Sequence, residues 1–209
     1  MKIVSIDPGL RNLGVVVLEK DSSTNKISVT YARVLDIARQ SDTDSFKVKS
    51  LSACLHAIEE VHNADVCVVE DNNYGRANTV PDNLLIQSAA GATMLALGAR
   101  ELVFYQSSFK FSCFFSLTPS VSGRVKGKFK LQSKVLAQNL VESFNVTGDV
   151  KCLTESDHLS DSFGLGMAAL VRGSARGQVV QQGVPRSLPV PVPTGVRTRR
   201  LPSVGSISS

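Results

Sequence analysis

Apolar and polar positions alternate along the first 35 residues with the period of β-strands. Three strands are predicted, separated by turn-forming residues, over 2–7, 13–18 and 26–35. The third strand is expected to place Ile27, Val29 and Tyr31 on one face. Because the links between these strands are short, they should form an antiparallel meander.

Beyond residue 43 the apolar spacing changes to three and four, which is typical of amphipathic helices. Helices are predicted over 44–63, 84–99, 128–144 and 158–171, and short apolar strands over 66–70 and 102–105. This order predicts an α/β fold with a mixed five-stranded sheet, in which the meander is followed by parallel strands and helices flank the sheet. The helix at 84–99 is rich in Ala and Gly, so a close packing partner is expected there, either the sheet or a second subunit.

The composition changes near Arg172. From there onward the chain has six arginines, five of its eight prolines and no acidic residue, whereas residues 1–171 hold 17 basic against 18 acidic residues. Such a segment, without apolar periodicity, is typical of disorder. We therefore expect a folded domain at 1–172 and a disordered basic tail at 173–209, which could add nonspecific DNA binding or act as a nuclear address.

Several classes of protein are disfavoured by the sequence. No apolar run approaches the roughly 20 residues of a membrane span, and the acid at position 7 interrupts any signal-peptide apolar region. The four cysteines have no CxxC spacing, which argues against a zinc site or a disulfide framework. A soluble intracellular protein is expected.

Acidic residues fall where the predicted elements begin or end. Asp7 ends the first strand and Glu70 ends the fourth, so both carboxylates share one edge if these strands are neighbours. Asp157, His158 and Asp161 begin the last helix, with spacings that place 157 and 161, or 158 and 161, on one helical face. Packing of this helix against the strand ends would gather three or four oxygen ligands with one imidazole.

Clustered carboxylates repel one another unless a cation neutralises them. Oxygen-rich sites suit Mg²⁺ or Mn²⁺. Two such ions about 3.5–4 Å apart can activate a water and stabilise the leaving oxygen in phosphodiester hydrolysis. The pattern therefore favours a metal-dependent nuclease.

Each residue also has an ordinary structural interpretation. Asp7 precedes Pro-Gly and suits a turn, Glu70 can open a solvated loop, and Asp157 can cap a helix. His158 and Asp161 can be surface residues of the first helical turn. It is their joint placement that favours a shared site.

Four motifs together resemble the RuvC-type Holliday-junction resolvases of the ribonuclease H-like superfamily, and in particular their poxvirus-like viral branch. The motifs are Ile6–Gly14, an acid followed by a glycine-containing hairpin; Val68–Glu70, an acid ending an apolar strand; Gln87–Gly91, a small-residue helix segment; and Asp157–Phe163, acids opening the last helix. The resemblance covers about residues 1–171. It implies a ribonuclease H-like fold and a structure-selective endonuclease that cleaves four-way DNA junctions as a homodimer.

The resemblance also implies roles for individual residues. Asp7, Glu70 and Asp161 match the metal-binding catalytic acids of the family. His158 stands where many members have Asp, and it is expected to serve as a further catalytic ligand, with the adjacent Asp157 as the alternative. Mg²⁺ is the expected cofactor, with Mn²⁺ able to substitute, and a viral member would act at a replication site in the cytoplasm or nucleus.

Candidate DNA contacts lie in two segments. One is a basic run of alternating charges, whose members are Arg124, Lys126, Lys128, Lys130 and Lys134. If extended, this run would present its first four charges on one side for phosphate contacts, and the resemblance places a functional lysine here, either Lys128 or Lys130. The other segment follows Glu70, where Tyr74 and Arg76 could contact an unpaired base. A solvated loop and an aromatic packed on its own domain are the structural alternatives.

An aromatic group in an otherwise polar segment is expected to serve core or dimer packing rather than base stacking; it comprises Phe109, Phe111, Phe114 and Phe115. Other functions share parts of the pattern. A ribonuclease H-like nuclease acting on RNA–DNA hybrids or other branched DNA would have the same acids, and a noncatalytic DNA-binding protein would keep the fold and basic surface. A sugar-kinase or actin-like ATPase is disfavoured because about 171 ordered residues cannot supply two such domains.

Overall fold

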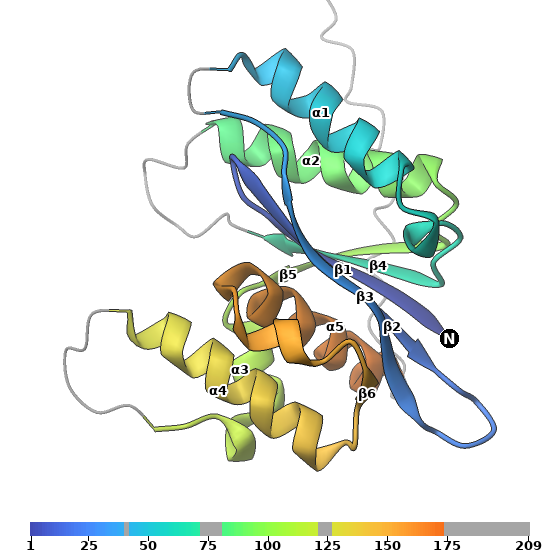
Figure 1. The fold of residues 1–209 in the computed structure, drawn as a ribbon, viewed down its shortest axis with the longest axis vertical. Coiled ribbons are helices and arrows are strands. Elements are labelled where there is room, and N and C mark those ends of the chain that lie inside the picture. The colour runs from blue at the N-terminus through green and yellow to red at the C-terminus, as the bar shows by residue number, and fades with distance from the viewer. Residues whose placement is uncertain (40–41, 72–80, 121–126, 174–209) are drawn as a thin grey trace, which may run out of the picture. The chain divides into compact units, whose positions relative to one another are not determined.

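The computed structural model describes residues 1–39, 42–71, 81–120 and 127–173. Within these residues, six strands form one sheet in the order β5-β4-β1-β2-β3-β6. Helices cover both faces of the sheet, with α1 and α2 on one side and α3, α4 and α5 on the other (Figure 1). The predicted mixed α/β sheet is thus confirmed, with six strands where five were expected.

The first three strands form the predicted meander. They are β1 (Lys2–Pro8), β2 (Asn12–Lys20) and β3 (Ile27–Asp36), paired antiparallel in sequence order. Asp21 orders the β2–β3 turn, because its carboxylate accepts hydrogen bonds from the Ser23 amide at 2.8 Å and from the Thr24 hydroxyl at 2.8 Å. Asn25 takes up a positive φ of 57° in the same turn, a conformation that asparagine tolerates better than most residues.

The remaining strands extend the sheet in both directions. β4 (Val66–Asp71) lies parallel to β1, and β5 (Glu101–Gln106) lies parallel to β4. On the opposite edge, β6 (Thr147–Gly148) pairs with β3. A strand of two residues carries no period in the sequence, which is why β6 was not predicted.

The prediction that Ile27, Val29 and Tyr31 share a face was wrong. The pairing of β2 with β3 shifts between Val17 and Leu18, because Val17 pairs with Tyr31 and Leu18 pairs with Val29. The extra residue of this bulge reverses the alternation that follows it. Ile27 and Val29 therefore face the core beneath α5, whereas Tyr31 packs against the core on the other face.

Two helices cover one face of the sheet. They are α1 (Asp44–His56) and α2 (Pro81–Ala96). The predicted helix at 44–63 was too long, because α1 ends at His56 and Ile58 has an extended backbone before a 3₁₀ turn at Glu59–Val61. Periodicity alone did not reveal this break, since Ile58 is buried although it lies outside the helix.

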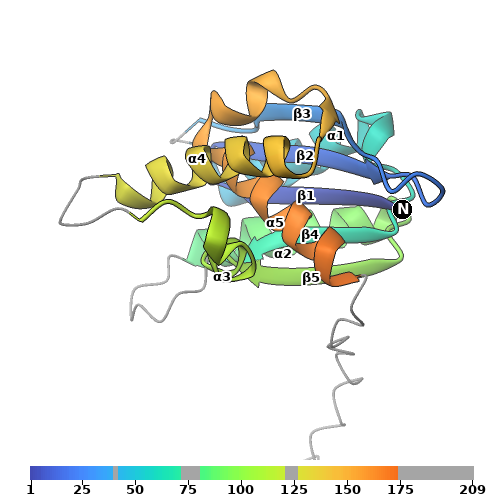
Figure 2. The ribbon, with the colours of Figure 1, turned by 90° about the horizontal axis from the view of Figure 1, so that it is seen from below.

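The other face carries α3 (Phe109–Cys113), α4 (Lys128–Ser143) and α5 (Asp157–Gly173), together with 3₁₀ turns at Phe115–Leu117 and Lys151–Thr154. Of these helices, α5 lies directly on the sheet and α4 packs outside it (Figure 2). Helix α3 and the three short 3₁₀ turns of the described residues were not predicted, because segments of three to five residues span about one turn and cannot show a repeating pattern.

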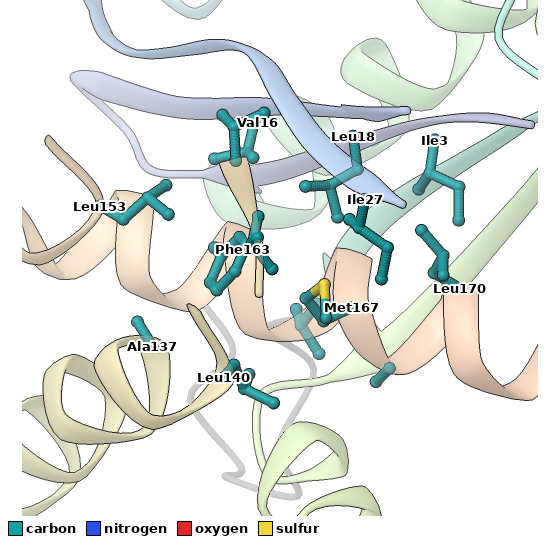
Figure 3. Packing of buried hydrophobic residues seen from close by; sticks show 14 of the residues in the cluster. Ile3, Val16, Leu18, Ile27, Ala137, Leu140, Leu153, Phe163, Met167 and Leu170 are labelled. Atoms are coloured by element: carbon teal, nitrogen blue, oxygen red, sulfur yellow. The ribbon is translucent and has the colours of Figure 1, made fainter. Parts of the chain in front are cut away.

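Both sheet faces bury apolar side chains, which explains the continuous apolar runs of β1, β2 and β4. On the α5 side, Phe163 and Met167 lie between the helix and the strand residues Val16, Leu18 and Ile27 (Figure 3). Such two-sided burial fixes the ends of β1 and β4 rigidly, which matters for the residues that those ends carry.

Two further sequence expectations concern the whole chain. All four cysteines are free thiols, in agreement with the lack of a disulfide pattern. Within the described ranges, no helix has both the length and the apolar character needed to cross a membrane. The predicted boundary near 172 and the basic tail stay predictions, since residues from 174 onward lie outside the described part of the chain.

Candidate active site

Asp7 and Glu70 lie at the ends of two neighbouring parallel strands. Ile6 of β1 is in register with Val69 of β4, so the residue that follows each of them reaches the same edge of the sheet. The side chains of both acids are buried, with 7% of Asp7 and 5% of Glu70 exposed. The shared edge was predicted only if β1 and β4 are neighbours. They are paired in the structure, and this pairing brings the two carboxylates together.

The third carboxylate comes from α5. One ligand oxygen from each of Asp7, Glu70 and Asp161 lies within 4.8 Å of the others. This convergence depends on Gly14, the register partner of Asp7 on β2. A Cβ atom at Gly14 would lie 2.6 Å from the carbonyl oxygen of His158, so only glycine lets the first turn of α5 approach the strand this closely. The Ser162 hydroxyl fixes the contact by donating to the Gly14 carbonyl at 3.0 Å.

His158 lies beside this group of acids. Its Nδ1 is 2.5 Å from Oδ2 of Asp7. The hydrogen bond with Asp7 raises the pKa of His158 above its ordinary value, although partial burial opposes the shift. The imidazole is thus held against Asp7 by this hydrogen bond.

Negative charge in this pocket is costly. Burial raises the pKa of Glu70 well above its ordinary value, and the charge of Asp7 adds to the shift, while Lys110 opposes it. Burial also raises the pKa of Asp7, against the effect of His158. Oε2 of Glu70 is buried and accepts no hydrogen bond from the described residues. A buried acceptor of this kind destabilises the fold unless a ligand meets it.

Lys110 is a site residue that the sequence analysis missed. Its side chain is fully buried, and its Nζ lies 2.8 Å from Oδ1 of Asp161. The hydrogen bonds of the ammonium are directed to Ser107, whose carbonyl and hydroxyl oxygens accept at 2.9 Å. Asp161 Oδ1 is close enough for ionic attraction but accepts no hydrogen bond from the part of the chain that the structure describes, so the contact is an ion pair.

A signal for Lys110 was present in the sequence, because this lysine stands between Phe109 and Phe111 just after β5. A lysine within an aromatic cluster is either an interruption of the cluster or a buried charge with a partner. In the structure Gly164 makes room for its stem, since a Cβ there would lie 2.7 Å from Cδ of Lys110.

Asp157 lies outside the group of three carboxylates. Its side chain is paired with two lysines of α4, with Lys130 Nζ at 2.7 Å and Lys134 Nζ at 3.5 Å. The structure therefore separates the two candidates for a fourth ligand, placing His158 against Asp7 and Asp157 against the basic helix. The Lys130 pairing lowers the pKa of Asp157 and keeps it charged.

The basic run is partly helical. Lys128, Lys130 and Lys134 lie in the first two turns of α4, so the extended alternation expected for this run does not hold over its second half. The first half, and the candidate base contact after Glu70, lie outside the described residues; they comprise Tyr74, Arg76, Arg124 and Lys126.

The four phenylalanines divide between two environments. Phe114 is buried in the core, and Phe109 and Phe111 pack partly buried against it. Phe115, by contrast, is 84% exposed. Core packing is therefore confirmed for three of the four, and they lie in or beside α3 rather than in a loop.

The donor set fits a divalent cation. Three carboxylates converge, one of their buried oxygens lacks a partner within the described chain, and an imidazole stands at the rim. Hard oxygen donors of this kind suit Mg²⁺ or Mn²⁺. Negative charge gathered on rigid strand ends is what a metal-assisted hydrolase requires.

The fold and this site define an α/β protein of the ribonuclease H-like class with a carboxylate cluster at one sheet edge. Among solved structures, Thermus thermophilus RuvC in complex with Holliday junction substrate matches with a TM-score of 0.60 at 14% identity, covering 84% of this chain and 97% of that one. The fowlpox virus resolvase bound to Holliday junction DNA matches with a TM-score of 0.50 at 18% identity, covering 82% and 97%. The yeast mitochondrial resolvase Ydc2 matches with a TM-score of 0.53 at 16% identity, covering 79% and 76%.

Sequence comparison names the family. The model for crossover junction endodeoxyribonuclease RuvC matches residues 3–114, which is more than half of the chain. A curated RuvC of Campylobacter hominis is 27% identical over 161 residues, covering 77% of this chain and 92% of that protein. The chain belongs to the family of crossover junction endodeoxyribonuclease RuvC.

Proposed function

We propose that this protein is a structure-selective endonuclease that cleaves four-way DNA junctions by metal-dependent phosphodiester hydrolysis. The observation that carries the proposal is the convergence of Asp7, Glu70 and Asp161 within 4.8 Å in a chain of the RuvC family. The buried Glu70 oxygen, which accepts no hydrogen bond from the described residues, and the raised pKa of that carboxyl are properties expected of a cation-binding site.

In this proposal the three carboxylates hold Mg²⁺, for which Mn²⁺ can substitute. When bound, such ions would supply an activated water and would neutralise charge on the leaving oxygen. His158 holds Asp7 in place through the hydrogen bond between its Nδ1 and Oδ2 of Asp7, which are 2.5 Å apart. Lys110 offsets part of the charge at Asp161 from the interior.

The lysines of α4 are the proposed phosphate contacts. Lys130 has a 70% exposed side chain and is tied to Asp157, the residue before His158. Each lysine that neutralises a phosphate releases counterions, so binding should weaken steeply with salt. Lys128 and Lys134 occupy the same two turns.

We propose that the active form is a homodimer built on α2, since paired cuts in a two-fold symmetric junction call for two equivalent sites. Over residues 83–96, the part of α2 whose side chains are described, the exposed residues form one helical face without charge, consisting of Leu84, Leu85, Ser88, Ala92, Leu95 and Ala96. The opposite side of the helix packs on the sheet, where Gly91 meets Leu102 and Phe104. The helix is thus suited to pack against the sheet on one side and against a second subunit on the other.

The test is cleavage of a labelled four-way junction with Mg²⁺ or Mn²⁺, beside a linear duplex and an RNA–DNA hybrid. We expect paired symmetric nicks in the junction alone. Asp7→Asn should bind the junction but reduce cleavage at least a hundredfold, whereas Asp149→Asn, an exposed aspartate beside β6, should cleave like wild type.

Other results would redirect the assignment. Preferred cleavage of the hybrid would favour a different nuclease of the same fold. Junction binding without cleavage, together with no heat of divalent-cation binding in calorimetry, would favour a noncatalytic DNA-binding protein. A viral origin and action at a viral replication site are narrower proposals, supported by the motif resemblance and by the fowlpox virus match.

A further inference from the structure

An exposed aromatic ring stands on the first turn of α4. Phe129 is 71% exposed, although a large apolar side chain gains little from such a position. Its ring is not isolated, because its centroid lies 6.5 Å from that of Phe111 on α3 in a tilted arrangement. Phe111 contacts one side of the Phe129 ring and leaves most of Phe129 exposed to solvent.

Phe129 is connected to the carboxylate cluster by two routes. Through Phe111 it reaches Lys110, whose Nζ lies 4.8 Å above the Phe111 ring and 2.8 Å from Asp161. Through the chain it adjoins Lys130, which is paired with Asp157 at the start of α5. The ring therefore borders the proposed catalytic site.

The charge around the ring indicates the chemistry of its partner. Lys128 and Lys130 flank Phe129, Lys134 follows one turn later, and the first turn contains no acid. Lysines at a helix N-terminus are opposed by the helix dipole, so they do not serve the stability of the helix. A nucleic-acid strand satisfies both features, because its phosphates pair with lysines and its bases stack on an aromatic face.

We infer that Phe129 is a base-stacking platform, which receives an unpaired base of the DNA next to the strand that is cut. The inference rests on the proposed nuclease function and extends it, because it names a residue that would contact an unpaired base of the substrate. Duplex DNA keeps its bases stacked inside, so a platform of this kind favours branched or partly unpaired DNA.

The test uses Asp7→Asn as the background, so that bound DNA is not cut. Four proteins are compared for junction affinity: one that keeps phenylalanine at position 129, and the variants Phe129→Tyr, Phe129→Leu and Phe129→Ala. We expect Tyr to bind like Phe, and Ala and Leu to bind about 5- to 100-fold more weakly. Phe46→Ala removes a ring that is 54% exposed on α1, on the other face of the sheet, and should leave affinity unchanged.

Direct contact is measured by photo-crosslinking. Junctions carrying 5-iodouracil near the branch point should crosslink to residue 129 in the Phe and Tyr forms, and the crosslink should be lost in the Leu form. Equal affinity of all four forms without a crosslink at position 129 overturns the inference. A Leu form that binds like Phe also overturns it, because apolar packing would then suffice.

Two further results separate this inference from its alternatives. Unchanged DNA binding by Phe129→Ala, combined with a change of sedimentation coefficient, would mean that the ring covers a second protein copy, and it would overturn base stacking. Failure of the wild-type protein to cut any junction would defeat the proposed function, whereas the crosslink and the Phe129-dependent affinity would still establish the platform.

Discussion

The ammonium group of Lys110 lies 2.8 Å from a carboxylate oxygen of Asp161, on a side chain that is completely buried. An isolated charge in such a place would be very unfavourable, yet here it is held by Ser107 and faces three acids. Through this ion pair, Lys110 offsets part of the negative charge of the acids from the interior of the protein. This makes it a positioning residue whose loss should affect folding and activity differently.

Lys110→Met keeps the length of the side chain and removes its charge. We expect the free energy of unfolding of the metal-free protein to fall by about 2–4 kcal/mol, somewhat less than for a fully buried pair because Asp161 is partly exposed. Junction cleavage should fall about 10- to 1,000-fold. Denaturant unfolding and single-turnover cleavage measure the two effects.

The matched control is Lys47→Met. Lys47 is also buried, on α1, and is paired with Asp44 at 3.2 Å on the other face of the sheet. It should lose stability without a specific loss of cleavage. Equal cleavage by the folded Lys110→Met and Lys47→Met proteins would contradict the role of Lys110.

Glu70→Gln is expected to stabilise the metal-free protein while abolishing cleavage. The pKa of Glu70 in the fold is raised well above 4.5 by burial, so its contribution to stability is fully present below the unfolded pKa and is lost as the pH rises through the folded pKa. The amide carries no charge and removes this penalty. At pH 7–8 the melting temperature should rise by about 2–4 °C for each kcal/mol relieved.

The pH dependence of stability tests whether the buried charge of Glu70 is the cause of this stabilisation. Wild type and Glu70→Gln should converge in stability near pH 4 and diverge as the pH rises, when both are measured in chelator. Addition of Mn²⁺ should raise the melting temperature of wild type and have little effect on the variant. A Glu70→Gln protein that is less stable than wild type at pH 8 would show that the carboxylate is already compensated.

Two glycine substitutions should distinguish an effect on the stability of the fold from an effect on cleavage at the active site. Gly14→Ala places a Cβ 2.6 Å from the carbonyl oxygen of His158, and the backbone at that point cannot yield without moving α5. We expect it to cost about 3 kcal/mol or more and to abolish cleavage. Gly164→Ala meets the flexible stem of Lys110 at 2.7 Å and gains helix propensity of up to about 1 kcal/mol.

The folded Gly164→Ala protein should therefore keep near-normal stability but cleave junctions more slowly, because the alanine displaces Lys110. Thermal unfolding and cleavage rate, measured on the same samples, test the contrast. Equal effects of the two substitutions on both readouts would show that close packing of α5 does not set the position of Lys110.

The proposed dimer is tested at Leu95. This residue is 50% exposed on the uncharged face of α2, so Leu95→Glu should place a charge in the interface and dissociate the dimer, detected by analytical ultracentrifugation. Leu131→Glu changes a leucine that is also 50% exposed, on α4, and should leave the association state unchanged. Identical sedimentation of Leu95→Glu and wild type would exclude this face as the interface.

Local pattern sufficed for the main strands and helices, and its failures have physical causes. The bulge at the β2–β3 pairing reversed the face of Tyr31, because a register shift depends on the partner strand and not on the strand itself. Helix α1 ended earlier than its period indicated, because Ile58 is buried from an extended backbone. Lys110 was overlooked for a related reason, since its burial depends on Gly164 and on Asp161 more than fifty residues away.

By itself, the sequence determined the order of the main strands and helices and the placement of Asp7, Glu70 and Asp161 near element ends, because hydrophobic period and strand termination are local properties. Tertiary structure alone decided which strands are neighbours, that His158 rather than Asp157 faces Asp7, and that a buried lysine stands among the acids. These choices depend on distances between segments far apart in the chain, and those distances are set by packing.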